Sequence, residues 1–394
     1  MTRRVGAAVL VLVALALALA GRPAGAETVT APLERVVEEQ LHASGAERLE
    51  RLQRQLEPEV RDLVPEVRLR DLALRPGQAL RLDAAALTRG ALRFFFREFV
   101  ANARLLAQVV VLAVLLAVLQ SLQGTLGDSA GQNVAFAACY LVLIILGVQS
   151  FRYAATVGRQ AVEGMVSVME ATLPLLSTLL VSSGAPTTAA MLSPIAYGMM
   201  TALSGLLDGV VVPLLLLSVV LGLAAQLSEK FPLNRLSDLA KQATVTVLGL
   251  SFIGFLWVMA VKGVAAPVGD SVVVKSGKFL ASTFVPVIGK MFGDAVEVVA
   301  GGALLVKSAV GLLGILLVAA YAFFPVLKIT ALVAVYKVAG ALIEPVSDRR
   351  LVKALQHLEG SLTVLAVVVG AVGVMFFMGL SYLVGVGNAA AALR

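Results

Sequence analysis

The sequence predicts an all-α, polytopic helical membrane protein with an N-terminal signal peptide and a small extracytoplasmic helical segment. The 394-residue chain is 59% hydrophobic and only 14% charged, with a mean hydropathy of +0.92. Apolar runs long enough to cross a bilayer recur along it, which is typical of membrane proteins. Charge is instead concentrated in residues 27–93, which hold 12 acidic residues and 11 arginines.

Residues 1–26 have the three parts of a secretory signal peptide. A basic start, "MTRR", precedes the apolar run "VGAAVLVLVALALALA", and "AGA" at 24–26 supplies small residues for cleavage. Cleavage would place the mature N-terminus, Glu27, outside the cytoplasm. The alternative is an uncleaved N-terminal anchor.

Residues 27–100 are expected to form an extracytoplasmic segment of short amphipathic helices. Leucines and valines recur there at helical spacing, and prolines at 58 and 65 interrupt the pattern. A segment of this size makes a small core, so we expect it to lean on a partner or on the membrane surface. It ends in "FFFREFV" (94–100), which suits a helix in the membrane interface.

Residues 101–394 are predicted to form a polytopic domain with seven or eight spans. Pro194–Gln226 is too long for one span and short for two, and the runs on either side of Pro325 suggest a helical hairpin. The expected spans are Leu105–Leu122, Val134–Phe151, Met165–Ser183, Pro194–Gln226, Ala243–Lys262, Ala309–Phe324, Val326–Ile343 and Ser361–Gly387.

The topology of the C-terminal half stays open at this stage. The segments 228–242 and 347–353 both have the basic character of cytoplasmic loops. They can share one side only if residues 271–307 cross the membrane or a span is miscounted. That segment could be an exposed loop, a re-entrant loop or a partly inserted helix.

The sequence offers no basis for an enzyme. His42 and His357 are isolated, and there is no phosphate-binding G-x-x-x-x-G-K-[ST] motif and no G-x-S-x-G nucleophile motif. The one cysteine, Cys139, lies in an apolar run, so the exported segment can form no disulfide of its own. No cofactor or metal is expected, and the modest net charge of +7 gives no case for nucleic acid as a partner.

Charged residues within the apolar runs are the remaining candidates, because intramembrane charge is costly and often functional. Glu170 lies four residues before Pro174, and Asp208 lies within "GLLDG", a G-x-x-x-G pattern that permits close helix approach. Both residues could belong to an ion or proton path. The alternative is that each is paired with a neighbour or lies at a helix end.

A second candidate is a charged stripe in residues 284–307. With 100° per residue, Lys290, Asp294 and Glu297 fall at about 0°, 40° and −20° on a helix. This stripe is either the solvated face of an interfacial helix or a surface toward a polar lumen or a partner protein.

Several stretches together resemble one known family, the stage III sporulation protein AE of endospore-forming bacteria. The resemblance is most specific in residues 278–345 and weak in residues 27–90. It is carried by "FREFVANARLL" (96–106), "YLVLIILGVQSF" (140–151), "PLLSTLLVSSGA" (174–185), "KFLASTFVPVIGKMFGDAVEVVAGGALLVKSAVGLLG" (278–314) and "FFPVLKITALVAVYKVAGALIEP" (323–345).

The resemblance implies a role in a multiprotein assembly in the mother-cell membrane around the engulfed forespore. This secretion-like assembly is thought to form a channel between the two cells. It implies further partners: other stage III sporulation membrane proteins, among them a separate ATPase and ring-forming proteins of the intermembrane space. The expected function is therefore a non-enzymatic component of that channel complex, with no catalytic residues to carry over.

Two other classes of function agree less well with the sequence. A stand-alone secondary transporter would have Glu170 and Asp208 in its path, but such transporters usually show paired repeats, and none is visible here. A membrane-embedded hydrolase is nearly excluded, because the sequence lacks the motifs of one.

Overall fold

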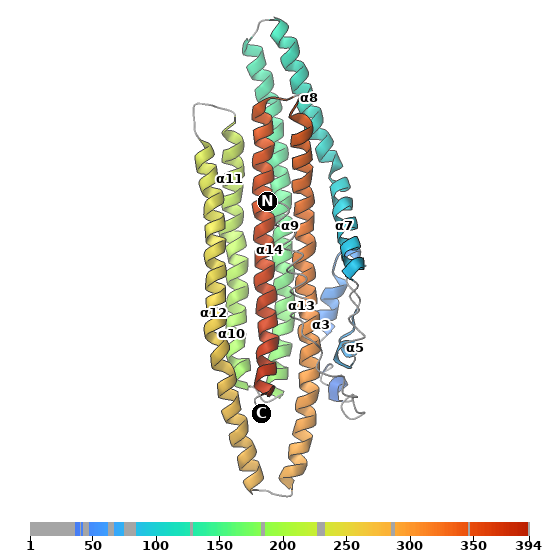
Figure 1. The fold of residues 1–394 in the computed structure, drawn as a ribbon, viewed down its shortest axis with the longest axis vertical. Helices are drawn as coiled ribbons and strands as arrows, with labels where there is room; N and C mark the ends of the chain where they lie inside the picture. Colours follow the sequence, from blue (N-terminus) through green and yellow to red (C-terminus); the bar gives the residue numbers. More distant parts are fainter. Residues whose placement is uncertain are drawn as a thin grey trace.

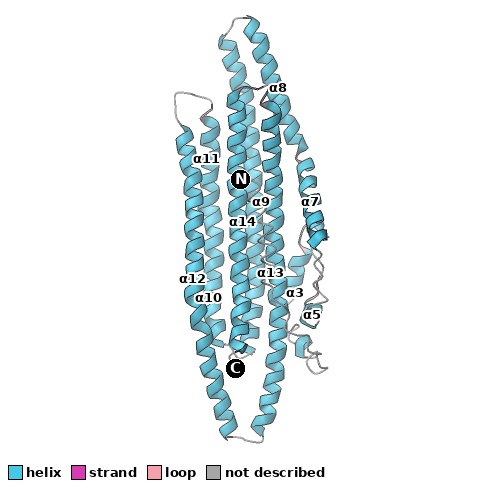
Figure 2. Ribbon diagram, viewed as in Figure 1, coloured by secondary structure: helices cyan, strands magenta, loops and turns pink. Residues whose placement is uncertain are grey.

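The computed structural model describes the chain from residue 36 onward, with gaps. The described residues are 36–39, 41, 47–61, 67–74, 84–126, 129–182, 186–226, 233–284, 288–345 and 347–392; side chains are not described at 59, 84, 119–136, 192, 261–300 and 386–392. The predicted signal peptide, His42 and the N-terminal part of the extracytoplasmic segment lie outside them. The described residues contain helices and turns and no strand (Figure 2), as the predicted fold class requires.

Long helices make up the fold, and several exceed what a bilayer needs. A helix of 54 residues is about 80 Å long, against a hydrocarbon core of about 30 Å. The elements are α3 (Glu47–Arg54), α4 (Pro58–Arg61), α5 (Leu69–Leu74), α7 (Ala84–Ala101), α8 (Ala103–Leu126), α9 (Ser129–Ser182), α10 (Pro186–Leu206), the π-helix η1 (Leu207–Val211), α11 (Val212–Ala224), α12 (Leu233–Phe284), α13 (Ile288–Ile343) and α14 (Arg349–Ala392).

Three helices, α9, α13 and α14, pack side by side along most of their length and form the centre of the bundle (Figure 1). Glycines allow the close approach. At Gly164 a Cβ would lie 2.3 Å from the ring of Tyr321, and at Gly373 it would lie 2.4 Å from Ala322 Cβ. Larger side chains at these two positions would push α9 and α14 away from α13.

The remaining helices lie on two sides of this centre (Figure 1). The continuous run α10–η1–α11 and helix α12 pack on one side, and α7 and α8 lie along the other. The N-terminal segment, defined here as α3 to α5 (47–74), packs against α13 and α9. The segment therefore leans on helices of its own chain.

Two ends of the bundle are named here by their connections. At the loop end α11 and α13 end and α12 and α14 begin, and at the hairpin end α12 ends and α13 begins; there these two helices project beyond the others (Figure 1). At the loop end, Asp348 Oδ1 accepts a hydrogen bond from the Arg350 backbone N–H at 2.8 Å, which caps the start of α14.

The number of spans differs from the sequence prediction. The sequence predicts seven or eight, but the described residues contain five helices long and apolar enough to cross a membrane, or six if α7 and α8, bent by 43° where they meet, count as one span. The chain is a polytopic helical membrane protein, and the candidate spans among its described residues are fewer and longer than the predicted ones.

Two corrections account for most of the difference. The predicted hairpin at Pro325 is wrong, because α13 continues through the proline, where packing against α9 and α14 holds both halves in line. The predicted spans 134–151 and 165–183 are likewise one helix, α9. Its polar middle stays helical because Ala154, Ala161 and other small residues there are buried against the bundle.

Residues 271–307 belong largely to the same helices. They are not one irregular loop, since described helix extends to Phe284 and resumes at Ile288. These two arms carry the chain out to the hairpin end and back. The basic segments 228–242 and 347–353 consequently meet at the loop end.

This arrangement predicts the outcome of topology mapping. In a Cys139→Ala background, single cysteines replacing Arg235 and Arg350 should react with an impermeant thiol reagent from the same side of the membrane. A cysteine replacing Lys275 should react from the opposite side, because α12 crosses between them. Labelling of positions 235 and 350 from opposite sides would contradict the bundle described here.

Candidate functional surface

The charged stripe of residues 290, 294 and 297, called the α13 stripe from here on, lies on the part of the molecule that projects farthest at the hairpin end (Figure 1). Lys290, Asp294 and Glu297 fall within α13, so the helical assignment of this segment holds. Their side chains lie outside the described residues. The stripe belongs to one arm of the projecting α12–α13 hairpin rather than to the packed centre of the bundle (Figure 1).

Asp208 lies on a π-helical turn, a geometry often found at functional positions. Pro213 explains the turn, because proline has no N–H to bond the carbonyl four residues earlier. The Val212 N–H reaches back to the carbonyl of Leu207 instead. The turn presents Asp208 on the outer surface, where its Oδ1 lies 2.8 Å from Nε of Arg159 on α9.

The G-x-x-x-G pattern around Asp208 does not serve close packing among the described helices. A Cβ placed on Gly205 or on Gly209 would meet no atom within 4 Å. The close helix approach that the pattern predicts is therefore absent within the described chain. Both glycines instead leave open space on the surface beside Asp208.

Glu170 also lies on the outer surface and is paired. Its Oε2 is 3.8 Å from Nη2 of Arg48 on α3, and its side chain is 47% exposed. Glu170 and Asp208 thus both occupy the paired arrangement that the sequence left open as an alternative. Neither lies inside the bundle.

A longer pattern on α9 joins these two sites and was missed in the sequence. Arg152, Arg159, Glu163 and Glu170 fall within about 20° of one line along the helix, and all four are exposed. They are called the α9 charged stripe below. The signal in the sequence is the spacing of seven, four and seven residues between these charges. It is hidden because the charges cross a polar stretch that predicts a break between two spans.

Another missed cluster ties the N-terminal segment to the bundle. Lys328 of α13 lies 3.2 Å from Glu57 Oε1 and 4.0 Å from Glu98 Oε1 of α7. Beside it the rings of Phe94 and Phe324 meet edge-on with centroids 5.2 Å apart. The lysine that ends the longest uncharged run of α13 is therefore neutralised by carboxylates from parts of the chain far away in sequence.

His357 is not isolated in space. Its Nε2 lies 3.1 Å from the Ser218 carbonyl oxygen and 3.0 Å from Ser237 Oγ, and its Nδ1 lies 3.2 Å from Lys241 Nζ. These contacts fit an imidazole whose Nε2–H donates to the Ser218 carbonyl and whose Nδ1 accepts from Lys241. Gly222 makes room for the ring. The cluster joins α11, α12 and α14 near the loop end and acts as a structural connection.

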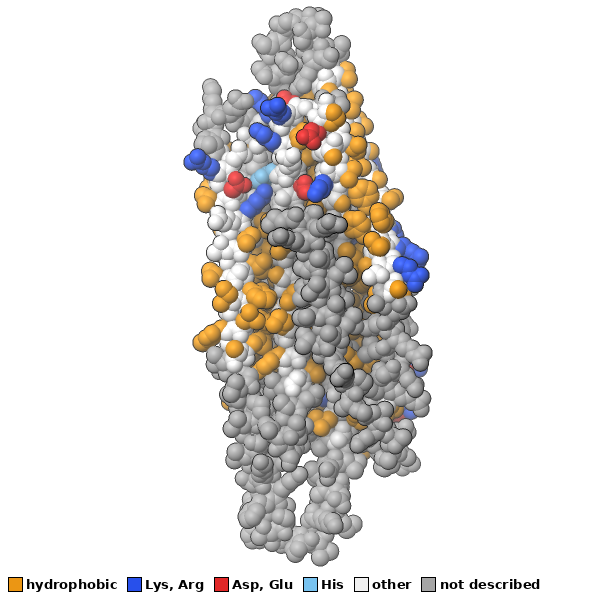
Figure 3. Space-filling view, viewed as in Figure 1, with side chains coloured by type: hydrophobic (Ala, Val, Ile, Leu, Met, Phe, Trp, Pro, Cys, Tyr) orange, Lys and Arg blue, Asp and Glu red, His pale blue; other side chains and the backbone are white. Residues whose placement is uncertain are grey.

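Charged side chains gather near the loop end on one face of the molecule, and apolar side chains cover much of the described surface below them (Figure 3). Near the loop end, Arg235 and Asp238 lie in the first turns of α12, and Lys337 Nζ of α13 lies 3.8 Å from Glu359 Oε1 of α14. This distribution resembles a membrane–water boundary at the loop end.

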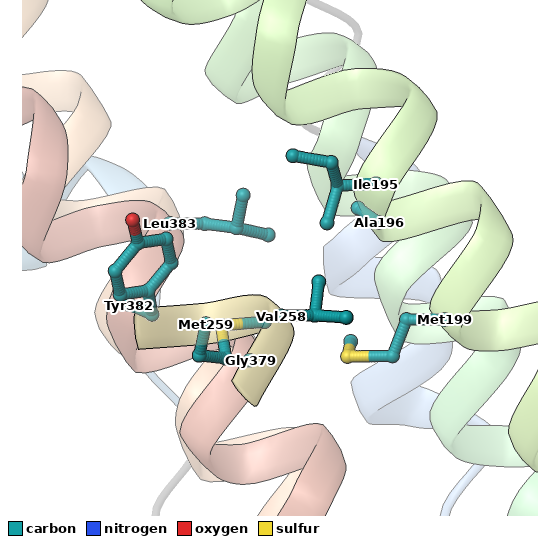
Figure 4. A pocket seen from close by; sticks show the side chains of 8 residues that line it. All are labelled: Ile195, Ala196, Met199, Val258, Met259, Gly379, Tyr382 and Leu383. Atoms are coloured by element: carbon teal, nitrogen blue, oxygen red, sulfur yellow. The ribbon is translucent and has the colours of Figure 1, made fainter. Parts of the chain in front are cut away.

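A shallow notch lies between α10, α12 and α14, and its lining is apolar apart from the hydroxyl of Tyr382 (Figure 4). Its other walls include Ile195, Met199, Val258 and Leu383. Neither Glu170 nor Asp208 reaches it. Among the described residues, no group of three or more His, Cys, Asp or Glu side chains could hold a metal ion.

Comparison with known proteins decides the family. The family model described as stage III sporulation protein AE matches residues 73–387. A curated relative of the same name from Bacillus subtilis (strain 168) is 32% identical over 295 residues, which cover 75% of this chain and 74% of the relative. The chain belongs to the stage III sporulation protein AE family. No solved structure matches it.

Membership of the stage III sporulation protein AE family confirms the resemblance and links the chain to sporulation. The match covers all of the long helices from α7 to α13 and most of α14, including the α9 charged stripe, Asp208 and Lys328. It begins at residue 73, after α3 and α4. Arg48 and Glu57, which pair with bundle residues, therefore lie outside the matched region.

The Lys328 cluster yields a stability prediction. Lys328→Met should weaken docking of the N-terminal segment, because Glu57 loses its lysine partner on α13. The same change leaves the buried Glu98 of α7 without that lysine, at a cost of about 1–3 kcal/mol. Limited trypsin digestion of the detergent-solubilised protein should then cleave faster at arginines between residues 48 and 61. Lys337→Met, which removes a more exposed lysine at the loop end, is the matched control and should not change that rate. Equal rates in both variants would contradict the assigned contact.

Proposed function

We propose that this protein is a non-enzymatic integral membrane component of the secretion-like channel complex that connects mother cell and forespore and is required for endospore formation. The observation that carries the proposal is the α9 charged stripe. A bundle with four exposed charged residues along one membrane helix is poorly suited to stand alone in lipid. Such a surface suits a subunit of a larger assembly.

The proposed location is the mother-cell membrane around the forespore. The loop end would face the mother-cell cytoplasm, since the segments 228–242 and 347–353 each carry three basic residues. The mature N-terminus would then be extracytoplasmic.

The proposed partners are other stage III sporulation membrane proteins, including a separate ATPase and ring-forming proteins of the intermembrane space. In the proposed orientation the α12–α13 hairpin would point into that space. The α13 stripe, Lys290, Asp294 and Glu297, would then be available to a polar partner or lumen beyond the membrane. A need for a separate ATPase is consistent with a sequence that lacks a phosphate-binding loop.

The transporter alternative gains no support from the positions of its two residues. A secondary transporter binds its substrate near the bilayer midplane between helices. Glu170 and Asp208 lie on the outer surface and pair with Arg48 and Arg159. The apolar notch between α10, α12 and α14 is lined by neither of them.

Deletion of the gene in its endospore-forming host tests the proposal. The deletion should reduce heat-resistant spores to background and stop exchange of a small dye between mother cell and forespore, followed by bleaching the forespore and recording recovery. Complementation with the wild-type gene should restore both. Dye exchange at the wild-type rate in the deletion strain would overturn the channel assignment.

The α13 stripe can be tested in the same strains. If it meets a partner or a lumen, Asp294→Ala or Lys290→Ala should abolish spore formation while the protein remains at its normal level by immunoblot. Loss of the protein itself would indicate a structural ion pair instead. Normal spore formation in both variants would remove the stripe from the proposed function.

A further inference from the structure

One side of the bundle is polar at the depth where the other side is apolar. The polar side consists of the α9 charged stripe, Asp208 on η1 and the exposed face of α3. On α3, the side chains of Glu47, Arg48 and Arg51 are 77%, 58% and 61% exposed. The α9 charged stripe and α3 come from distant parts of the sequence, so each shows independently that this side of the bundle is polar.

The contacts that α9 and α13 make with α14 show which part of α14 lies level with the polar side. Gly158 packs against Val369, and Gly314 contacts both Thr172 and Leu380. The stripe residues of α9 lie between or beside these contacts. Over the same length α14 carries no charged residue, as expected for a helix inside the hydrocarbon core.

Helix α12, on the apolar side of the bundle, lies level with the same part of α14. Phe255 of α12 approaches α14 at Gly379, close to the level of Leu380. Around it, α12 exposes Leu250, Ile253 and Trp257, which are 64%, 65% and 68% exposed. Surfaces of this kind face lipid in a membrane protein, so the polar side lies within the bilayer as well.

Lipid is an unfavourable neighbour for the polar side. A charged residue at the centre of a membrane helix costs about 2.5–3.5 kcal/mol on insertion scales. Ion pairs with Asp208 and Arg48 reduce this cost for Arg159 and Glu170. Arg152 and Glu163 form no ion pair with any residue that the structure describes. Water or polar protein must therefore cover this side.

The length of the polar side favours water. Arg152 and Glu170 are 18 positions apart, about 27 Å along the helix, which matches a hydrocarbon core of about 30 Å. A patch that binds a partner can be short, whereas a water path must extend through the whole core. The buried side chains of the single bundle are mainly apolar, and the buried polar ones form local clusters, so one copy offers no such path among its described residues.

We propose that several copies of this chain assemble with their polar sides inward around a water-filled lumen lined by the α9 charged stripe. The inference rests on the proposed function and adds the location of the conduit. The stripe carries two arginines and two glutamates, so the lumen would admit small hydrophilic solutes of either charge. The apolar outer faces of α12 would meet lipid.

Thiol accessibility tests the lumen, starting from a Cys139→Ala chain that retains spore formation. Thr156→Cys and Gln160→Cys place thiols on the polar side, and Leu250→Cys and Ile253→Cys are matched controls that are also exposed in the single chain. Positively and negatively charged methanethiosulfonates are applied to membranes from sporulating cells. The two polar-side thiols should react at least about tenfold faster than the controls with both reagents, because thiolates form in water and not in lipid.

Each other outcome overturns the proposal. Equally slow reaction at all four positions would mean that lipid or another protein covers the polar side. Equally fast reaction would place this level outside the bilayer. Failure of two differently tagged copies to co-purify would exclude a lumen between copies. If the polar-side thiols react slowly while spore formation and dye exchange are normal, the lumen is overturned and the proposed function stands. If dye exchange is undisturbed after deletion of the gene, the proposed function itself is overturned.

Discussion

The packing of α13 against α9 and α14 is the contact on which the rest of the structure depends. Glycines at 164, 311, 314 and 373 bring the three helices close along most of their shared length, and apolar side chains such as Met165, Leu317 and Phe376 fill the space between them. Because this contact is long and continuous, it holds both halves of α9 and α13 straight across Pro174 and Pro325. A bent or broken helix would lose burial on one side of the break.

This central packing also determines which surfaces remain for the surroundings. The shared faces of the three helices are used within the bundle, so the charged stripe of α9 is left outside. Helix α3 binds next to that stripe through Arg48 and Glu170, and Lys328 holds Glu57 a few turns away. The N-terminal segment thus extends a polar surface, while α12 completes an apolar one. The asymmetry follows from the way the helices are arranged around the centre.

Polar contacts inside the bundle have a different character from those on its polar side. The cluster of Ser218, Ser237, Lys241 and His357 is largely buried, and each group meets several partners within hydrogen-bonding distance. It fixes α11, α12 and α14 relative to one another near the loop end. The α9 charged stripe, by contrast, has partners at Arg159 and Glu170 and open surface between them. The first arrangement stabilises a fold, and the second suits contact with water or other subunits.

The sequence by itself determined the class of protein, because apolar runs of sufficient length leave few alternatives to membrane helices. It also determined the family and the positions of Asp208 and Glu170 within those helices. Only the tertiary structure decided that the polar stretch 152–164 continues a helix, that Pro325 is not a turn and that Asp208 pairs with Arg159. The reason is physical: hydropathy reports whether a residue tolerates lipid, whereas helix continuity and charge pairing depend on which neighbours the other helices supply.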